Sequence, residues 1–118
     1  MQTDKAIISF SQSEKIKAGI TWVSNALNII DALPSSEKKG GEKAITVMIN
    51  MMYQEIRLAG AVSGLQEWLE IGPHLDKAVM MIDSGVGLAA IDHLTKALSM
   101  TTNIGQRSMS ALKENNLL

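Results

Sequence analysis

Residues 44–68 read AITVMINMMYQEIRLAGAVSGLQEW, and two apolar lines run through this segment at helical spacing. Stepping by three and four residues, the first line passes through Ala44, Val47, Met51, Leu58, Ala61, Leu65 and Trp68, interrupted only by Gln54. The second line, rotated by about 100° on an α-helix, passes through Ile45, Ile49, Met52, Ile56 and Ala59. Together they make an apolar face wider than a helix with one solvent side normally carries. The pattern predicts a helix at the centre of a helical bundle.

The flanking segments have helical patterns too, and glycine and proline mark the boundaries between them. We expect helices at residues 11–33, 42–71, 73–83 and 85–114, with an N-terminal arm at 1–10 and a frayed tail at 115–118. Ser11 and Glu14 fit a capping box at the first helix, which should end before Pro34. Asp83 to Gly87 is interpreted as a turn, although one long helix could also carry it. The prediction is a single all-α domain over residues 1–118, with the helix at 42–71 central.

Composition narrows the classes of function. Lysine and arginine total 11 against 12 acidic residues, and the only arginines are Arg57 and Arg107. Nucleic-acid binding normally needs clustered basic residues, so that class is disfavoured. The chain has no cysteine, which excludes disulfides and thiolate sites and fits a cytoplasmic protein. Charged residues interrupt every long apolar run, so we expect no membrane helix.

The sequence contains little that points to catalysis or to a cofactor. There are two histidines, no Gly-x-Ser-x-Gly elbow, no phosphate-binding glycine loop and no Glu-x-x-His pair for a metal. The eight methionines are interpreted as packing residues, because no second type of soft-metal ligand accompanies them. We therefore expect a protein that is not an enzyme, with no cofactor and no metal site.

One short segment has a likeness to a known family. His93-Leu94-Thr95-Lys96-Ala97 resembles the His-x-x-Lys-Gly pattern of histidine phosphotransfer domains, which are helical bundles of similar length. The resemblance implies that His93 accepts a phosphoryl group and that Lys96 supports it. Ala97 stands where the family has glycine. The alternative interpretation is an ordinary helix histidine.

The surplus of apolar residues favours association with other chains. Hydrophobic residues make up 46% of a short chain, and such a surplus often forms a subunit interface. We expect a self-associating adaptor or small assembly subunit, and we expect both tryptophans in or beside buried contacts. The interface candidates are Trp22, Met51, Leu58, Leu65 and Trp68. The alternatives are a phosphotransfer module using His93 and Lys96, and a small subunit of a nucleic-acid-associated complex.

Overall fold

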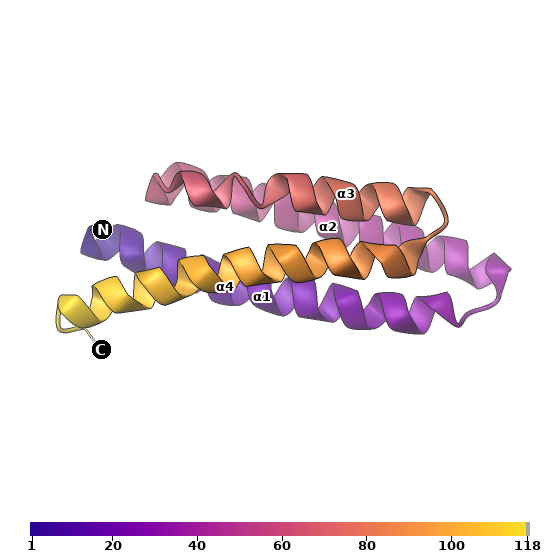
Figure 1. Cartoon of the computed structure of the whole chain (residues 1–118), viewed down its shortest axis with the longest axis horizontal. Helices are drawn as coiled ribbons and strands as arrows, with labels where there is room; N and C mark the ends of the chain where they lie inside the picture. The colour runs from indigo at the N-terminus through magenta and orange to yellow at the C-terminus, as the bar shows by residue number, and fades with distance from the viewer. Residues whose placement is uncertain (118) are drawn as a thin grey trace.

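The computed structural model describes residues 1–117, which form four α-helices running back and forth along one axis (Figure 1). The helices are α1 (Thr3–Asp31), α2 (Ser35–Ser63), α3 (Gly72–Asp83) and α4 (Ala90–Glu114). Short 3-10 turns, η1 (Gln66–Trp68) and η2 (Gly87–Ala89), precede α3 and α4. The molecule measures 53 × 22 × 18 Å, so it is a slender rod. The predicted all-α bundle is confirmed.

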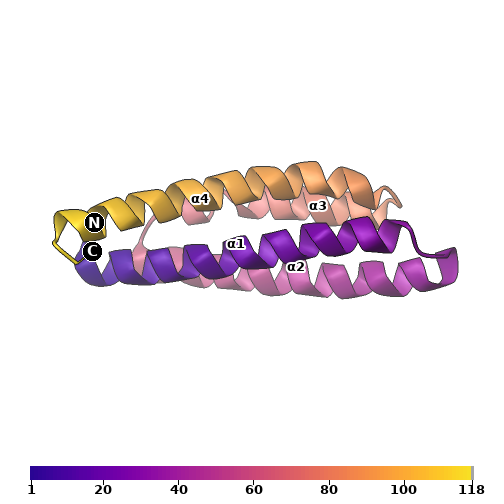
Figure 2. The same cartoon turned by 90° about the horizontal axis from the view of Figure 1, so that it is seen from below.

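The helices form two layers, which Figure 2 shows edge-on: α3 with α4 in one, and α1 with α2 in the other. Between the layers, α1 packs extensively against α4, whereas α2 and α3 make much looser contact. The bundle is therefore tight along one side and open along the other.

The first helix is longer than predicted, and the expectation of an arm at 1–10 is wrong. α1 begins at Thr3, and its buried line passes through Ala6, Ser9, Ser13, Ile16, Ile20, Val23 and Leu27. This line has regular steps of three and four residues, but its first turns use small and polar residues in place of large apolar ones. The capping pattern at Ser11 therefore lies inside the helix and does not mark its start.

The small residues of α1 face small residues of α4, which lets the two backbones approach closely. A Cβ added to Gly105 would lie only 2.6 Å from Oγ of Ser13. The Ser13 hydroxyl donates to the carbonyl of Phe10 at 2.7 Å, and Thr101 donates to the carbonyl of Ala97 at 2.8 Å. Each of these two buried hydroxyls thus has a hydrogen-bond partner in its own helix, so neither is left unpaired by the close packing.

The boundaries of α2 differ from the predicted 42–71 at both ends. The helix starts directly after Pro34 and carries Gly40 and Gly41 inside it. It ends at Gly64, whose φ of 74° is left-handed and whose amide donates to the carbonyl of Gly60. A glycine in that conformation is a common end of a helix. The chain then turns back along the bundle. Because Gly60 has no side chain, Leu69 can pack against it; a Cβ at Gly60 would lie 3.2 Å from the Leu69 side chain.

The remaining boundaries agree more closely. α3 matches the predicted 73–83 to within a residue, with Pro73 in its first turn. The predicted turn after Asp83 is confirmed, and Gly85 in it has a φ of 80°. α4 starts at Ala90 instead of residue 85 because η2 takes up the intervening residues, and it ends at Glu114 as expected. Of the predicted frayed tail at 115–118, Leu118 lies outside the described residues.

Only one apolar line of each long helix is buried. On α2 the line from Ile45 to Ala59 forms core, while Val47, Met51 and Leu58 of the other line are exposed. α1 follows the same rule, with Ile29 exposed at 68%. The prediction of a central α2 is therefore corrected: α2 is no more central than the other helices, because a two-layer bundle of four helices gives each of them one buried face.

The close packing of α1 against α4 predicts opposite effects for two glycine-to-alanine changes. Gly105→Ala should destabilise the fold by about 1–3 kcal/mol, because the new methyl group overlaps Ser13. Gly40→Ala should stabilise it by about 0.5–1 kcal/mol, because the added Cβ meets nothing within 4 Å beyond the adjoining turns of its own helix and the site is helical. Urea unfolding of the two variants measures both. Equal effects on the midpoint would contradict the packing described here.

Candidate functional site

The outer face of the α1–α2 layer carries two apolar grooves. One, which we call the tryptophan groove, has a volume of about 320 Å³ and is lined mainly by Trp22, Met48 and Met51. The other, the leucine groove, has a volume of about 370 Å³, and Ile8 and Leu58 lie on its walls. Both lie along the seam where α1 meets α2, so they form one elongated surface.

A polar bridge separates the two grooves. Nε2 of Gln12 donates to the carboxylate of Glu55 at 3.0 Å and to its backbone carbonyl at 3.2 Å. Nζ of Lys15 lies 2.9 Å from the other carboxylate oxygen. The hydrogen bond from Gln12, followed by the contact with Lys15, holds the pKa of Glu55 below its ordinary value. The bridge therefore stays ionised at neutral pH and joins α1 to α2 in a fixed register.

Three of the predicted interface residues are exposed on this surface. Met51 is 61% exposed, Leu58 54% and Trp22 66%. The expectation that Trp22 lies in a buried contact is therefore wrong within one chain. Trp22 lies next to Val23 on the helix, about 100° away from the buried line, and so it points outward.

The other two candidates lie elsewhere. Trp68 is fully buried, and its indole Nε1 donates to Oγ of Ser9 at 3.1 Å. Its prediction as a buried residue is confirmed, but as an interface residue it is corrected, because the chain turns at Gly64 and brings the indole onto α1. Leu65 is half-buried and directly follows that turn. Leu65 and Trp68 have the spacing of the first apolar line in the sequence. In the structure they lie beyond the end of α2, so they do not share its face.

The α3–α4 layer carries a different kind of cluster. His74 and Lys77 lie one turn apart on α3, and His93 and Lys96 are one turn apart on α4. Both lysines are exposed and both imidazoles are half-buried. Burial, and then the charges of Lys77, Lys96 and His93, lower the pKa of His74 below its ordinary 6.5. The charges of α4 therefore reach His74 on α3.

Sequence reasoning found His93 and Lys96 but missed their counterparts on α3. The segment His74-Leu75-Asp76-Lys77-Ala78 repeats the pattern His93-Leu94-Thr95-Lys96-Ala97, with His, Leu, Lys and Ala at identical spacing. The leucine and alanine of each copy are fully buried. This repeat was the sequence signal that could have pointed to His74 and Lys77. Because the leucine and the alanine of each copy face the core, the histidine and the lysine have the same position relative to the core on both helices.

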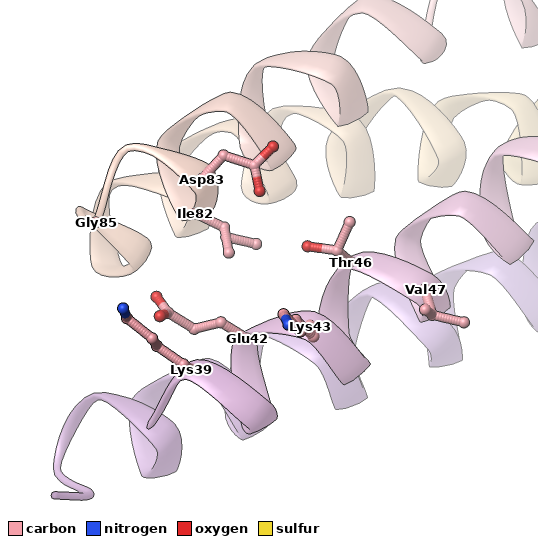
Figure 3. A pocket seen from close by; sticks show the side chains of 8 residues that line it. All are labelled: Lys39, Glu42, Lys43, Thr46, Val47, Ile82, Asp83 and Gly85. Carbon is pink, nitrogen blue, oxygen red and sulfur yellow. The ribbon is translucent and has the colours of Figure 1, made fainter. Parts of the chain in front are cut away.

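A hollow larger than either groove lies on the looser side, between α2 and α3, and has a volume of about 560 Å³. Figure 3 shows Lys39, Glu42 and Thr46 of α2 opposite Ile82 and Asp83 of α3. Its lining mixes both signs of charge. Among the described residues, no three histidine or acidic side chains come together as metal ligands would. The hollow therefore offers no constellation that favours a particular ligand.

Comparisons with protein-family models, curated proteins and solved structures find no match to this chain. The assignment of a function consequently depends on the geometry alone. Within residues 1–117, none of the helices combines the length and the apolar character needed to cross a membrane.

The lowered pKa of His74 makes the stability of the fold depend on pH. The unfolded chain binds a proton at His74 at a higher pH than the folded chain does, so stability should fall as pH drops from neutral to about 5. In His74→Gln this part of the loss should disappear. Histidine proton NMR of the folded and the urea-unfolded protein measures the shift directly. A His74 that titrates at the same pH in both states would refute the account.

Proposed function

We propose that this chain is a non-catalytic helical-bundle protein that acts by associating with other protein chains, first of all with a second copy of itself. The observation that carries the proposal is the pair of apolar grooves on the α1–α2 face, with Trp22 exposed at 66% beside Met48 and Met51. Tryptophan and methionine are enriched at protein interfaces, and two neighbouring apolar grooves of this kind are costly to leave in water. An adaptor or a small assembly subunit fits such a surface.

The order of features along the face favours a second copy as the occupant. A twofold axis parallel to the helices, between two facing α1–α2 layers, would place each groove against the same groove of the other copy. It would also place α1 over α2 of that copy, so that Lys15 faces the second copy's Glu55. Apolar surface then meets apolar surface, and opposite charges meet between the grooves.

The other classes have less support from the molecule. A nucleic-acid-associated subunit would need a long basic surface, and the α3–α4 face offers only a compact cluster. The cytoplasm remains the proposed compartment, since a chain without cysteine needs no oxidising environment.

Two methionine variants test the dimer. Met51 and Met80 are equally exposed, at 61% and 60%, but Met51 lies on the proposed interface and Met80 on α3 in the other layer. We expect the unmodified protein to sediment as a dimer at micromolar concentration. Met51→Glu should weaken dimerisation at least tenfold, because the carboxylate would lose water without gaining a partner, whereas Met80→Glu should leave it unchanged.

The emission of Trp22 gives a second readout of the same equilibrium. The difference between the spectra of the unmodified protein and Trp22→Phe isolates this indole, since Trp68 remains buried in both. On dilution the Trp22 component should move to longer wavelength as the dimer separates. A monomer at high concentration, or equal effects of the two glutamate variants, would rule out the α1–α2 face as the dimer interface.

A further inference from the structure

The outer faces of α1 and α2 repeat their features at the same interval. On α1, Ile8 lines the leucine groove, Lys15 belongs to the polar bridge and Trp22 lines the tryptophan groove, and each is seven residues from the next. On α2, Met48 lines the tryptophan groove, and Glu55 of the bridge follows it by seven residues. Seven residues are nearly two helical turns, so the members of each series lie on one side of their helix.

Two close approaches fix the register between these antiparallel helices (Figure 2). A Cβ added to Gly19 would lie 2.8 Å from Sδ of Met52, and a Cβ added to Gly41 would lie 3.0 Å from the side chain of Ile30. Gly19 to Ile30 is eleven residues along α1, and Gly41 to Met52 is eleven residues along α2. The two helices therefore keep one constant register between these contacts.

This register places the two seven-residue series level with each other. Trp22 lies three residues beyond Gly19 on α1, so it is level with the position three residues before Met52 on α2, which is one residue from Met48. The same count places Lys15 one residue from the level of Glu55. One residue is about 1.5 Å along a helix, so both pairs are level to within that distance.

The charges of the bridge favour one way of facing two copies. A twofold axis across the helices at the bridge would place α1 over α1, so that Lys15 faces the second copy's Lys15 and Glu55 its Glu55. An axis parallel to the helices keeps every level and places α1 over α2, so that opposite charges meet. That same axis brings Trp22 to the level of the second copy's Met48.

We propose that Trp22 of each copy docks into the tryptophan groove of the other copy, against Met48 and Met51; this inference rests on the self-association proposed above. Trp22 is 66% exposed, and it lies on the wall of its own groove without filling the volume of about 320 Å³. A tryptophan side chain can bury about 150–250 Å², and methionine sulfur makes favourable contacts with aromatic rings.

The reciprocal contact would make Trp22 the anchor of the dimer. The twofold axis forms the contact twice, and each contact is linked through the seven-residue interval to a pair of Lys15 and Glu55. Sliding one copy by a turn would remove Trp22 from the groove and separate the charges together. Trp22 therefore determines the register and the orientation of the two copies as well as their affinity.

A matched pair of alanine variants tests the anchor. Ile29 is 68% exposed and lies seven residues beyond Trp22 on the same side of α1, but of the described residues it lines neither groove. Trp22→Ala should weaken dimerisation at least about thirtyfold in sedimentation, and Ile29→Ala less than about threefold. Equal losses would show general apolar cover and overturn the anchor.

An exchange of charges tests the contact itself. Trp22→Lys and Met48→Glu should each be monomeric at a concentration where the unmodified protein is a dimer, because a charge would enter the apolar contact. Mixed in equal amounts, the two variants should form a heterodimer, detected by native mass spectrometry. In it the new lysine meets the new glutamate, while the remaining Trp22 docks on the remaining Met48. Circular dichroism checks that both variants keep the helical fold.

The second mixture separates the two orientations. An axis across the helices would bring Trp22 near the second copy's Ile8, so Trp22→Lys should then pair with Ile8→Glu and not with Met48→Glu. That result, or no heterodimer in the first mixture, would overturn the proposed contact while self-association stands. A monomeric unmodified protein would instead remove the proposed function on which the contact rests.

Discussion

The close approach of α1 to α4 is the contact on which the rest of the bundle depends. Ser13 and Gly105 meet where no larger pair would fit, and the nearby turns of the two helices bury the small side chains of Ala6, Ser9, Thr101 and Ser108. From Ile16 onward, the buried residues of α1 are large and apolar, and they form part of the core. The α2–α3 side makes looser contact and stays open at the hollow near Glu42.

This asymmetry explains why each of the two long helices buries only one of its apolar lines. A two-layer bundle gives a helix two neighbours on one side and water on the other. The line from Ile45 to Ala59 forms part of the core, and Val47, Met51 and Leu58 of the other line stay exposed. An exposed line that repeats along a helix and adjoins a similar line on α1 is an extended surface and not a scatter of single residues, and it is therefore the natural place for another chain to bind.

The helical class and the number of long helices follow from spacing alone, since periodicity indicates a helix directly. Spacing marks both lines of α2 as apolar but does not say that only the line from Ile45 to Ala59 is buried. The start of α1 was not predicted, because Ala6, Ser9 and Ser13 are too small and polar to register as core, although their spacing is regular. The end of α2 depended on which of several glycines becomes left-handed, and Gly64 was not distinguishable from Gly60 in the sequence. Whether Trp22 or Val23 faces inward depended on the helix that α1 meets. His74 was missed because the repeated pattern draws attention to its histidine only once the two helices that carry it are known to pack together.

The proposed dimer has a consequence for which apolar residues stay in water. Two facing α1–α2 layers would cover Trp22, Met51 and Leu58, which line the two grooves. Both α3–α4 layers would then face outward, so Met80, which is as exposed as Met51, would stay in water on either side of the particle. Unequal cover of equally exposed residues is what separates an interface from the single apolar residues that every small fold leaves on its surface.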